Sequence, residues 1–245
     1  MYGTRLRLFS ALTAVTLMAA YGLAFFFAPM DADQGFSQKI FYVHVPMAII
    51  ALGGFVFGGV MAVQHLRTRD PRYDLKSYVA IHLSVVLGVG VLISGSIWAR
   101  AAWGVWFEWR EPTLVSFLIV FLLYCTYQPL RFSIEDPEKQ ARYASVFAIT
   151  AGAFVPLNFL AVRLADPFIH PRVLNNTGGA LPVDMKIPFY LALLGMGLLF
   201  TTLWKYEMAH KHSRAQLRSL RRKLGGEDVV AVGRSAAPRV TSAAP

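Results

Sequence analysis

The chain has 245 residues, of which 56% are hydrophobic and 16% are charged, and its mean hydropathy is +0.47. This balance is too apolar for a surface that faces water, so it excludes a soluble globular domain. The formal net charge is +10, but the basic residues lie beside apolar segments and near the C-terminus, as topology signals and partners of lipid headgroups do. We therefore expect a protein that contacts membrane lipid and no nucleic acid.

Six segments are long and apolar enough to cross the bilayer, which takes about 20 residues. Because every backbone polar group in hydrocarbon must be satisfied internally, the segments are predicted to be helices. The fold class is therefore all-α, a polytopic integral membrane protein with six transmembrane helices. The first segment lacks a small-x-small cleavage site, so we interpret it as a span rather than a signal peptide. The predicted spans are residues 8–28, 40–63, 77–99, 112–130, 143–162 and 187–204, and none contains Asp, Glu, Lys or Arg.

Lysine and arginine orient these spans. With the N-terminus inside, 18 of the 24 basic residues fall on the cytoplasmic side and six on the other, so the positive-inside rule places the N-terminus and the C-terminus in the cytoplasm. We expect residues 1–204 to form the membrane domain and residues 205–245 a basic cytoplasmic tail. The distal part of the tail is rich in Ala, Pro, Ser and Val and has little to bury, so it is predicted to be disordered.

The first candidate site residue is His44, at the outer end of the second predicted span, in the segment Lys39-Ile-Phe-Tyr-Val-His44-Val-Pro46. A histidine near the interface can present a ring nitrogen to a metal, and the proline that follows can tilt the helix. The alternative is a histidine that only bonds a neighbouring helix. Ionisable residues inside a membrane are nevertheless functional hypotheses by default.

The second candidate is the tryptophan segment, residues 98–112, which the topology also places on the outer side. It holds four of the five tryptophans of the chain. An interfacial belt is the alternative interpretation, but a belt would scatter indoles across both interfaces. Clustered indoles with arginines between them favour a large, planar, anionic ligand. The residues concerned are Trp98, Trp103, Trp106 and Trp109, with Arg100 and Arg110.

The third candidate is His170, in the connection between the last two spans, with Arg163 and Arg172 on either side. Two neutral imidazoles that approach from opposite sides are the usual way to hold haem iron. The remaining histidines, at positions 65, 82, 210 and 212, are predicted to lie on the surface or in packing contacts. The single cysteine, Cys125, excludes a disulfide framework and a multi-cysteine metal site, and the absence of Cys-x-x-Cys-His excludes covalent c-type haem.

Together these segments resemble the haem-handling CcmC family of cytochrome c maturation. The resemblance covers about residues 35–205. It is carried by Phe-Tyr-Val-His44-Val-Pro-Met-Ala, Gly95-Ser-Ile-Trp98-Ala-Arg100, Trp103-Gly-Val-Trp106-Phe-Glu-Trp109, Val155-Pro156 and His170-Pro171.

Two segments differ from the usual pattern of that family. Its tryptophan motif runs Trp-x-Trp-Asp-x-Arg-Leu-Thr, whereas here Phe107 replaces one tryptophan and Arg110-Glu111-Pro112 replaces the Asp-x-Arg part. The segment before His170 lacks the family's Trp-Arg-Thr-Leu. Lys39 keeps the basic residue that the family commonly has five positions before the first histidine.

The resemblance implies that haem b is bound non-covalently and transiently at the periplasmic face of the bacterial inner membrane. The iron would be held axially by His44 and His170, with the tryptophan segment against the porphyrin. The chain would bind and transfer haem rather than act as an enzyme. The implied partners are a CcmE-like periplasmic haem chaperone, ABC transporter subunits like CcmA and CcmB, and a small CcmD-like membrane protein. The implied cofactor-binding residues are His44, His170, Trp98, Trp103, Trp106, Trp109, Lys39, Arg100, Arg110, Arg163 and Arg172.

Three alternatives remain open at this point. A CcsA-like cytochrome c synthase shares the tryptophan segment, but such chains are longer and carry a further histidine pair inside the membrane. A b-type haem electron-transfer subunit needs histidine pairs deep in facing spans, where this chain offers His82 alone. A solute transporter would favour broken helices or charges near the midplane of the membrane.

Overall fold

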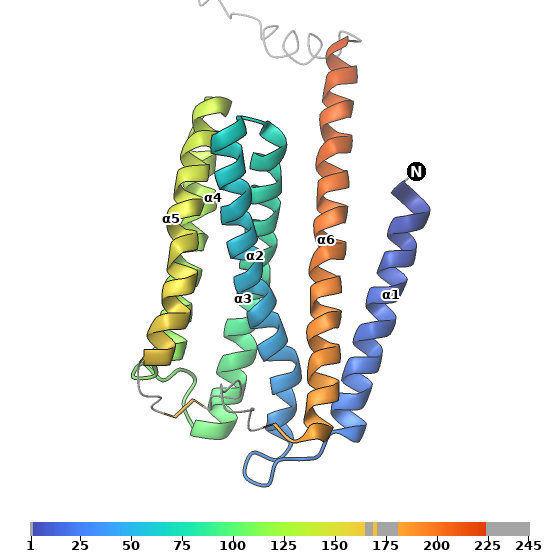
Figure 1. Cartoon of the computed structure of the whole chain (residues 1–245), viewed down its shortest axis with the longest axis vertical. Helices are drawn as coiled ribbons and strands as arrows, with labels where there is room; N and C mark the ends of the chain where they lie inside the picture. The colour runs from blue at the N-terminus through green and yellow to red at the C-terminus, as the bar shows by residue number, and fades with distance from the viewer. Residues whose placement is uncertain (1, 165–168, 171–180, 224–245) are drawn as a thin grey trace, which may run out of the picture. The chain divides into compact units, whose positions relative to one another are not determined.

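The computed structural model describes residues 2–164, 169–170 and 181–223, which form mainly long helices (Figure 1). Within this part of the chain, six helices are long and apolar enough to cross a membrane, which confirms the predicted fold class. The long helices are α1 (Tyr2–Gly22), α2 (Phe41–Thr68), α3 (Pro71–Trp103), α4 (Pro112–Phe132), α5 (Pro137–Leu164) and α6 (Val183–Lys223), and the short ones are η1 (Leu23–Phe27) and η2 (Phe36–Ile40).

Local signals set where α3 and α4 begin. Each helix has an acidic N-cap followed by proline. The N–H of the first helical residue has no partner within the helix, so proline, which has no N–H, is well suited to that position. Asp70 accepts a hydrogen bond from the Arg72 N–H at 2.8 Å, and Glu111 accepts one from the Thr113 N–H at 3.3 Å. At the other end, α3 stops where Gly104 adopts a φ of 76°, a left-handed conformation that favours glycine.

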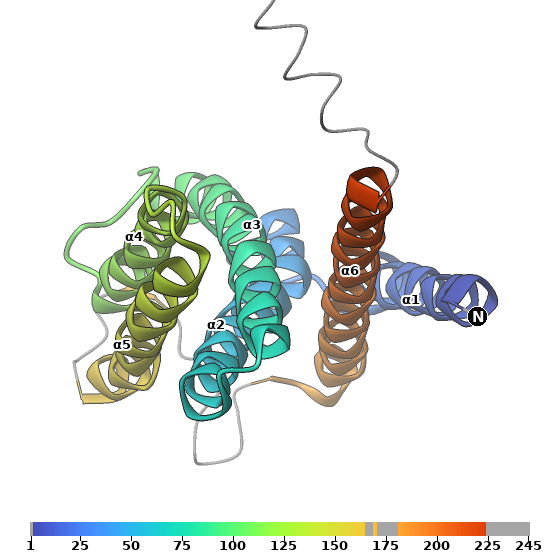
Figure 2. The same cartoon turned by 90° about the horizontal axis from the view of Figure 1, so that it is seen from above.

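The helices α2, α3, α4 and α5 form one group (Figure 2), and aromatic and small residues build its core. The rings of Phe55 and Tyr124 stack with centroids 3.8 Å apart. Gly59 of α2 lies against Gly152 of α5, where a Cβ on Gly59 would be 3.9 Å from the Gly152 Cα. Small residues allow membrane helices to approach backbone to backbone. Packing of this kind holds α2 and α5 together.

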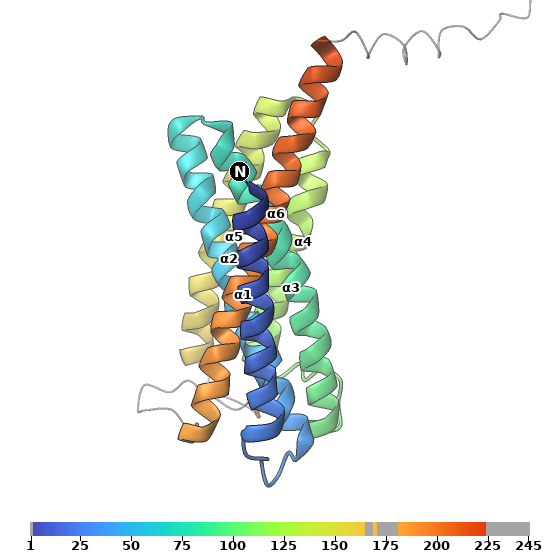
Figure 3. The same cartoon turned by 90° about the vertical axis from the view of Figure 1, so that its right-hand side faces the viewer.

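Helix α1 lies beside the part of α6 that precedes Lys205 (Figures 2 and 3). The hydroxyls of Thr13 and Thr202 are 2.8 Å apart. Leu17 of α1 fills the space at Gly195, where an added Cβ would lie 2.7 Å from its Cδ2. The Lys205 ammonium also lies over the Phe9 ring, 5.6 Å from its centroid, so polar, close-packing and cation–π contacts join α1 to α6.

Contacts between Cα atoms divide the chain after Lys205. In the second unit the described residues, 206–223, continue the helix and are mostly exposed. Glu207 and Lys211 form an ion pair at 3.3 Å, one helical turn apart. This segment carries six Lys or Arg residues.

A buried ion pair joins α3 to α4 at the end opposite the tryptophan segment. The two guanidinium NH groups of Arg131 donate to the two carboxylate oxygens of Asp74 at 2.7 and 2.6 Å, and Tyr127 lies 3.3 Å from the same guanidinium. Both charged residues are 8% exposed. They fall just outside the charge-free spans predicted from the sequence, because α3 and α4 extend beyond those spans. A bidentate pair of this geometry compensates the cost of burying the charges.

Candidate functional site

Three segments that are far apart in the sequence meet at one end of the helices, the lower end in Figure 1. They are the connection before η2, the tryptophan segment, and the residues Ile169 and His170. A cavity of about 580 Å³ lies among them, a volume typical of small-molecule and cofactor sites. Its lining is mainly aliphatic and aromatic and includes both His44 and His170. The two histidines singled out in the sequence therefore share one cavity.

Ser94 of α3 determines which nitrogen of the His44 ring carries the proton. The Nδ1 atom of His44 lies 2.9 Å from the Ser94 hydroxyl, which itself lies 2.8 Å from the carbonyl oxygen of Gly90. Because a carbonyl only accepts, the hydroxyl donates to Gly90 and accepts the N–H of Nδ1. This tautomer leaves the lone pair of Nε2 available for a metal, as in many histidine ligands that are held from behind.

Gly95, the next residue of α3, makes room for the same ring. A Cβ on Gly95 would lie 2.8 Å from Cε1 of His44. That distance is shorter than a normal contact between carbon atoms, so a side chain at this position would displace the imidazole. Two adjacent residues of α3 thus place His44, one through a hydrogen bond and the other through the absence of a side chain.

His170 lies against two indoles of the tryptophan segment. The centroid of its ring is 6.2 Å from that of Trp98 and 6.1 Å from that of Trp103. The two indoles also contact each other, at 4.8 Å and 77°. All three pairs have the edge-to-face arrangement that aromatic rings favour. Both tryptophans also line the cavity, so they support the histidine and form part of the site wall.

Glu111 connects the tryptophan segment to the backbone at His170. Its side chain is buried, at 0% exposure, and Oε2 accepts hydrogen bonds from the N–H groups of Ile169 at 3.0 Å and His170 at 3.1 Å. Burial by itself raises the pKa of this carboxyl, but the N–H donors of Ile169, His170 and Thr113 outweigh burial, and the pKa lies below its usual value. Glu111 is therefore held as a carboxylate.

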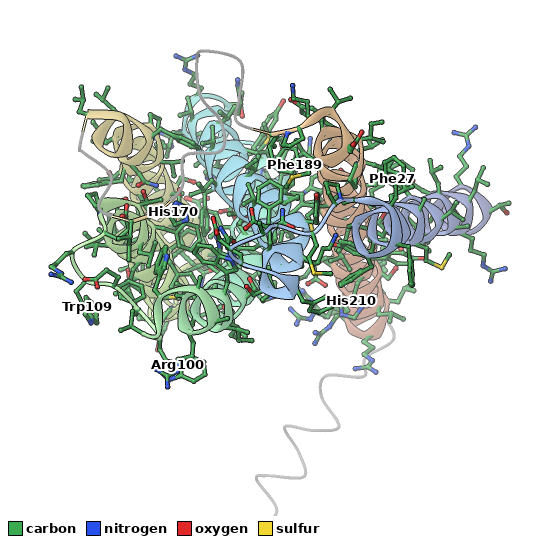
Figure 4. All side chains as sticks on the ribbon, turned by 90° about the horizontal axis from the view of Figure 1, so that it is seen from below. Phe27, Arg100, Trp109, His170, Phe189 and His210 are labelled. Carbon is green, nitrogen blue, oxygen red and sulfur yellow. The ribbon has the colours of Figure 1, made fainter. Side chains whose placement is uncertain are left out.

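The four clustered tryptophans divide into two groups. Trp98, Trp103 and Trp106 line the cavity. Trp98 also donates its Nε1–H to Oε1 of Gln34 at 3.2 Å, which ties α3 to the connection before η2. Trp109 is not among the described lining residues and is 71% exposed, and Figure 4 shows it at the edge of the molecule, away from His170. Of these inner indoles, Trp98 and Trp103 are half-buried and Trp106 is 61% exposed. All three can contact a bound ligand, whereas Trp109 faces outward.

Lys39 has a buried position. It is 3% exposed, and its ammonium group donates to the carbonyl oxygens of Ala28 at 2.6 Å and Pro29 at 3.2 Å. Those carbonyls follow η1, where a helix end leaves acceptors without partners from the helix. In this arrangement Lys39 joins the end of the first span to the start of the second, and it does not belong to the described cavity lining.

Arg100 and Arg110 do not belong to the described cavity lining. Arg100 donates to the carbonyl of Gly104 and points outward in Figure 4. Arg110 pairs with Glu108, with Nε 2.9 Å from Oε1, and this hydrogen bond raises the pKa of Arg110 and lowers that of Glu108. Arg172 and the side chain of Arg163 are outside the described part of the chain.

Two other histidines lie in α2 and α3 and have partners of their own. The Nδ1 atom of His65 is 3.0 Å from the carbonyl oxygen of Asp70, and that of His82 is 2.7 Å from the amide of Gln128. Neither histidine lines the cavity.

Four residues that are not among the predicted site residues complete the site. Ser94 and Gly95 place His44, Glu111 holds the backbone at His170, and Gln38 lines the cavity at 5% exposure. The pattern Glu111-Pro112-Thr113 is typical of a helix start, so it predicts the N-cap bond. The pattern carries no signal for the hydrogen bonds from Ile169 and His170, because these residues lie 58 and 59 positions further along the chain.

Comparison with known proteins assigns the family. The family model CcmC, described as heme exporter protein C, matches residues 1–223. Heme exporter protein C of Rhodobacter capsulatus is 32% identical over 201 residues, which is 79% of this chain and 80% of the relative. Proteins with the same description are 30% identical over 197 residues in Paracoccus denitrificans, with 80% and 81% covered, and 28% identical over 191 residues in Escherichia coli K12, with 78% and 77% covered. The chain is therefore a member of the CcmC family, and the resemblance drawn from its histidine and tryptophan motifs is confirmed.

Proposed function

We propose that the chain binds haem b in the cavity between His44 and His170 and passes it to a haem chaperone outside the membrane. One observation carries this proposal: two histidines from distant parts of the chain line a single apolar cavity together with Trp98 and Trp103. Imidazoles are common axial ligands of haem iron, and indoles suit the faces of a porphyrin. The description of the relatives as heme exporter protein C agrees with this ligand.

The residues of the chain would divide the work as follows. Nε2 of His44 would meet the iron, while Ser94 holds the opposite nitrogen. His170 would meet it from the other side, and the inner indoles would exclude water from the ring. Binding would be non-covalent, because the single Cys125 is part of α4 and no Cys-x-x-Cys-His is present in the sequence.

Basic residues would pair with the propionates. We propose Arg100, Arg163 and Arg172 for this role, and Lys39 and Arg110 as cations that shape the rim of the site. Arg100 lies at the same end of the helices as the cavity and is exposed, so its side chain can turn toward a bound anion. Bidentate pairing with carboxylates is the chemistry that guanidinium supplies best.

The proposed setting is the bacterial inner membrane, with the cavity on the periplasmic side and residues 205–245 as a cytoplasmic tail. The basic residues between the spans support this orientation through the positive-inside rule. The chain would act by binding and transfer rather than by catalysis. It would deliver haem to a CcmE-like chaperone and work with ABC subunits like CcmA and CcmB and a small CcmD-like protein.

The test is the optical spectrum of the purified protein with its single variants. The wild-type chain should carry six-coordinate haem. His44→Ala should abolish or strongly reduce haem, and added imidazole should restore part of it by filling the vacant axial position. His170→Ala should behave alike, whereas His65→Ala and His82→Ala should match the wild type. Normal six-coordinate haem in His170→Ala would remove that residue from the site.

A further inference from the structure

Glu111 joins two parts of the site that are distant in the sequence. Its Oε1 accepts the N–H of Thr113 at 3.3 Å, the N-cap bond that opens α4. Its Oε2 accepts the N–H groups of Ile169 and His170 at 3.0 and 3.1 Å. One side chain therefore ties the start of α4 to the residue that carries the second imidazole.

The surroundings of Glu111 favour the ionised carboxylate. The residue is fully buried, and a buried charge is costly unless hydrogen bonds compensate it. Here the backbone N–H groups of Thr113, Ile169 and His170 donate to the carboxylate and supply such compensation. Two consecutive N–H groups that converge on one oxygen form an anion-binding concavity. Hydrogen bonds to a charged group are also stronger than neutral ones.

The bond to Glu111 affects the ring of His170 through the backbone. The backbone nitrogen and the side chain of His170 are bonded to the same Cα, so a hydrogen bond that fixes the backbone N–H also restricts the position of Cβ. The imidazole ring itself lies against Trp98 and Trp103. Glu111 itself is not among the described residues that line the cavity. Its influence on a ligand would therefore pass through His170.

We infer that Glu111 is a positioning residue for the second axial ligand, His170. The inference rests on the proposed function, in which His170 meets the iron. Glutamine is not a substitute, because both carboxylate oxygens accept from backbone N–H groups. An amide in this place would turn its NH₂ group toward a donor.

The test is a titration of ferric haem into the purified full chain, read by absorption. Glu111→Gln should weaken binding by about 10- to 100-fold, the usual effect of losing a group that orients a metal ligand. Glu111→Ser, which keeps a good N-cap but is too short to reach His170, should do the same. Both variants should gain five-coordinate haem that added imidazole converts back to six-coordinate. Glu108→Gln is the matched control, since that carboxylate lies in the same segment and pairs with Arg110. It should bind as the wild type does.

A double variant shows whether the effect passes through the histidine. In a His170→Ala background, with imidazole added to restore part of the haem, Glu111→Gln should cause no further loss of affinity. An equal loss in both backgrounds would overturn the inference, as would wild-type affinity and spectrum in Glu111→Gln. Wild-type behaviour of Glu111→Ser would reduce Glu111 to a helix cap and also overturn it.

Hydrogen exchange separates this inference from the proposed function. In the haem-free chain, the amides of Ile169 and His170 should exchange faster in Glu111→Gln than in the wild type or in Glu108→Gln. Unchanged exchange would overturn the positioning role whatever the chain binds. A wild-type chain that takes up no haem would overturn the proposed function instead.

Discussion

The hydroxyl of Ser94 accepts the Nδ1 proton of His44 at 2.9 Å, so α2 carries the histidine and α3 determines which of its nitrogens keeps a lone pair. The two residues are 50 positions apart in the chain. Partners of this kind orient a ligand and increase its basicity. In the proposed function, the ring of His44 is therefore already oriented for the iron before haem binds.

Ser94→Ala should weaken haem binding by about 10- to 100-fold, because the imidazole loses the acceptor that fixes its tautomer and orientation. The measurement is the affinity for ferric haem of the purified protein. Ser116→Ala is a suitable control, since that hydroxyl also bonds to the backbone of its own helix but lies outside the described cavity lining. Equal affinities in wild type and Ser94→Ala would show that the hydroxyl does not place the ring.

Gly95→Ala should also reduce haem binding, although alanine normally stabilises a helix relative to glycine. The added Cβ would lie 2.8 Å from Cε1 of His44 and would push the ring away from its position. Gly53→Ala in α2 has no heavy atom within 4 Å of the added Cβ, so this control should retain binding. If both variants keep full haem occupancy, the close approach of Gly95 to the His44 ring is not required for haem binding.

The two groups of tryptophans should separate in function. Trp103→Ala removes a lining residue that also contacts His170, so haem should be lost from the purified protein. Trp109→Ala changes an exposed side chain outside the described lining, so haem should remain and any defect should appear in transfer to the chaperone. Haem retention and chaperone loading are measured on the same preparations. Equal loss of abundance in both variants would instead favour an interfacial belt that anchors the fold.

Asp74→Asn should destabilise the helix bundle. Arg131 would keep its buried position without a charged partner, and breaking a buried pair in this way costs about 3–5 kcal/mol in the free energy of unfolding. Thermal unfolding in detergent is the measurement. Glu207→Gln removes one member of a more exposed helical pair and should change stability by less than about 0.5 kcal/mol. No difference between the two variants would mean that Asp74 contributes little to stability.

The orientation in the membrane is open to chemical labelling. In a Cys125→Ser background, a cysteine at Asp33 should react with a membrane-impermeant thiol reagent in intact cells, and one at Glu135 should not. Both positions are exposed. Asp33 lies in the connection between η1 and η2, and Glu135 lies in the connection between α4 and α5, at the opposite end of the helices. Labelling at Glu135 with Asp33 silent would place the cavity on the cytoplasmic side.

Much of the fold could be predicted from the sequence because the solvent imposes it. A segment without charges that is long enough to cross hydrocarbon has to satisfy its backbone internally, so composition alone leads to six helices. Asp70-Pro71 and Glu111-Pro112 are recognisable helix starts. The span limits are less accurate, since α3 and α4 extend past the charge-free segments to bury Asp74 and Arg131 together.

The sequence by itself also singled out His44 and His170 and the clustered indoles, because these residue types are unusual and concentrated. Their placement around one cavity, the tautomer set by Ser94, the space left at Gly95 and the hold of Glu111 on the backbone at His170 were decided by the tertiary structure. The physical reason is that each of these contacts joins residues from different elements. Whether two such side chains meet depends on how the helices rotate and pack against one another, and hydrophobic periodicity within one segment does not encode that relation.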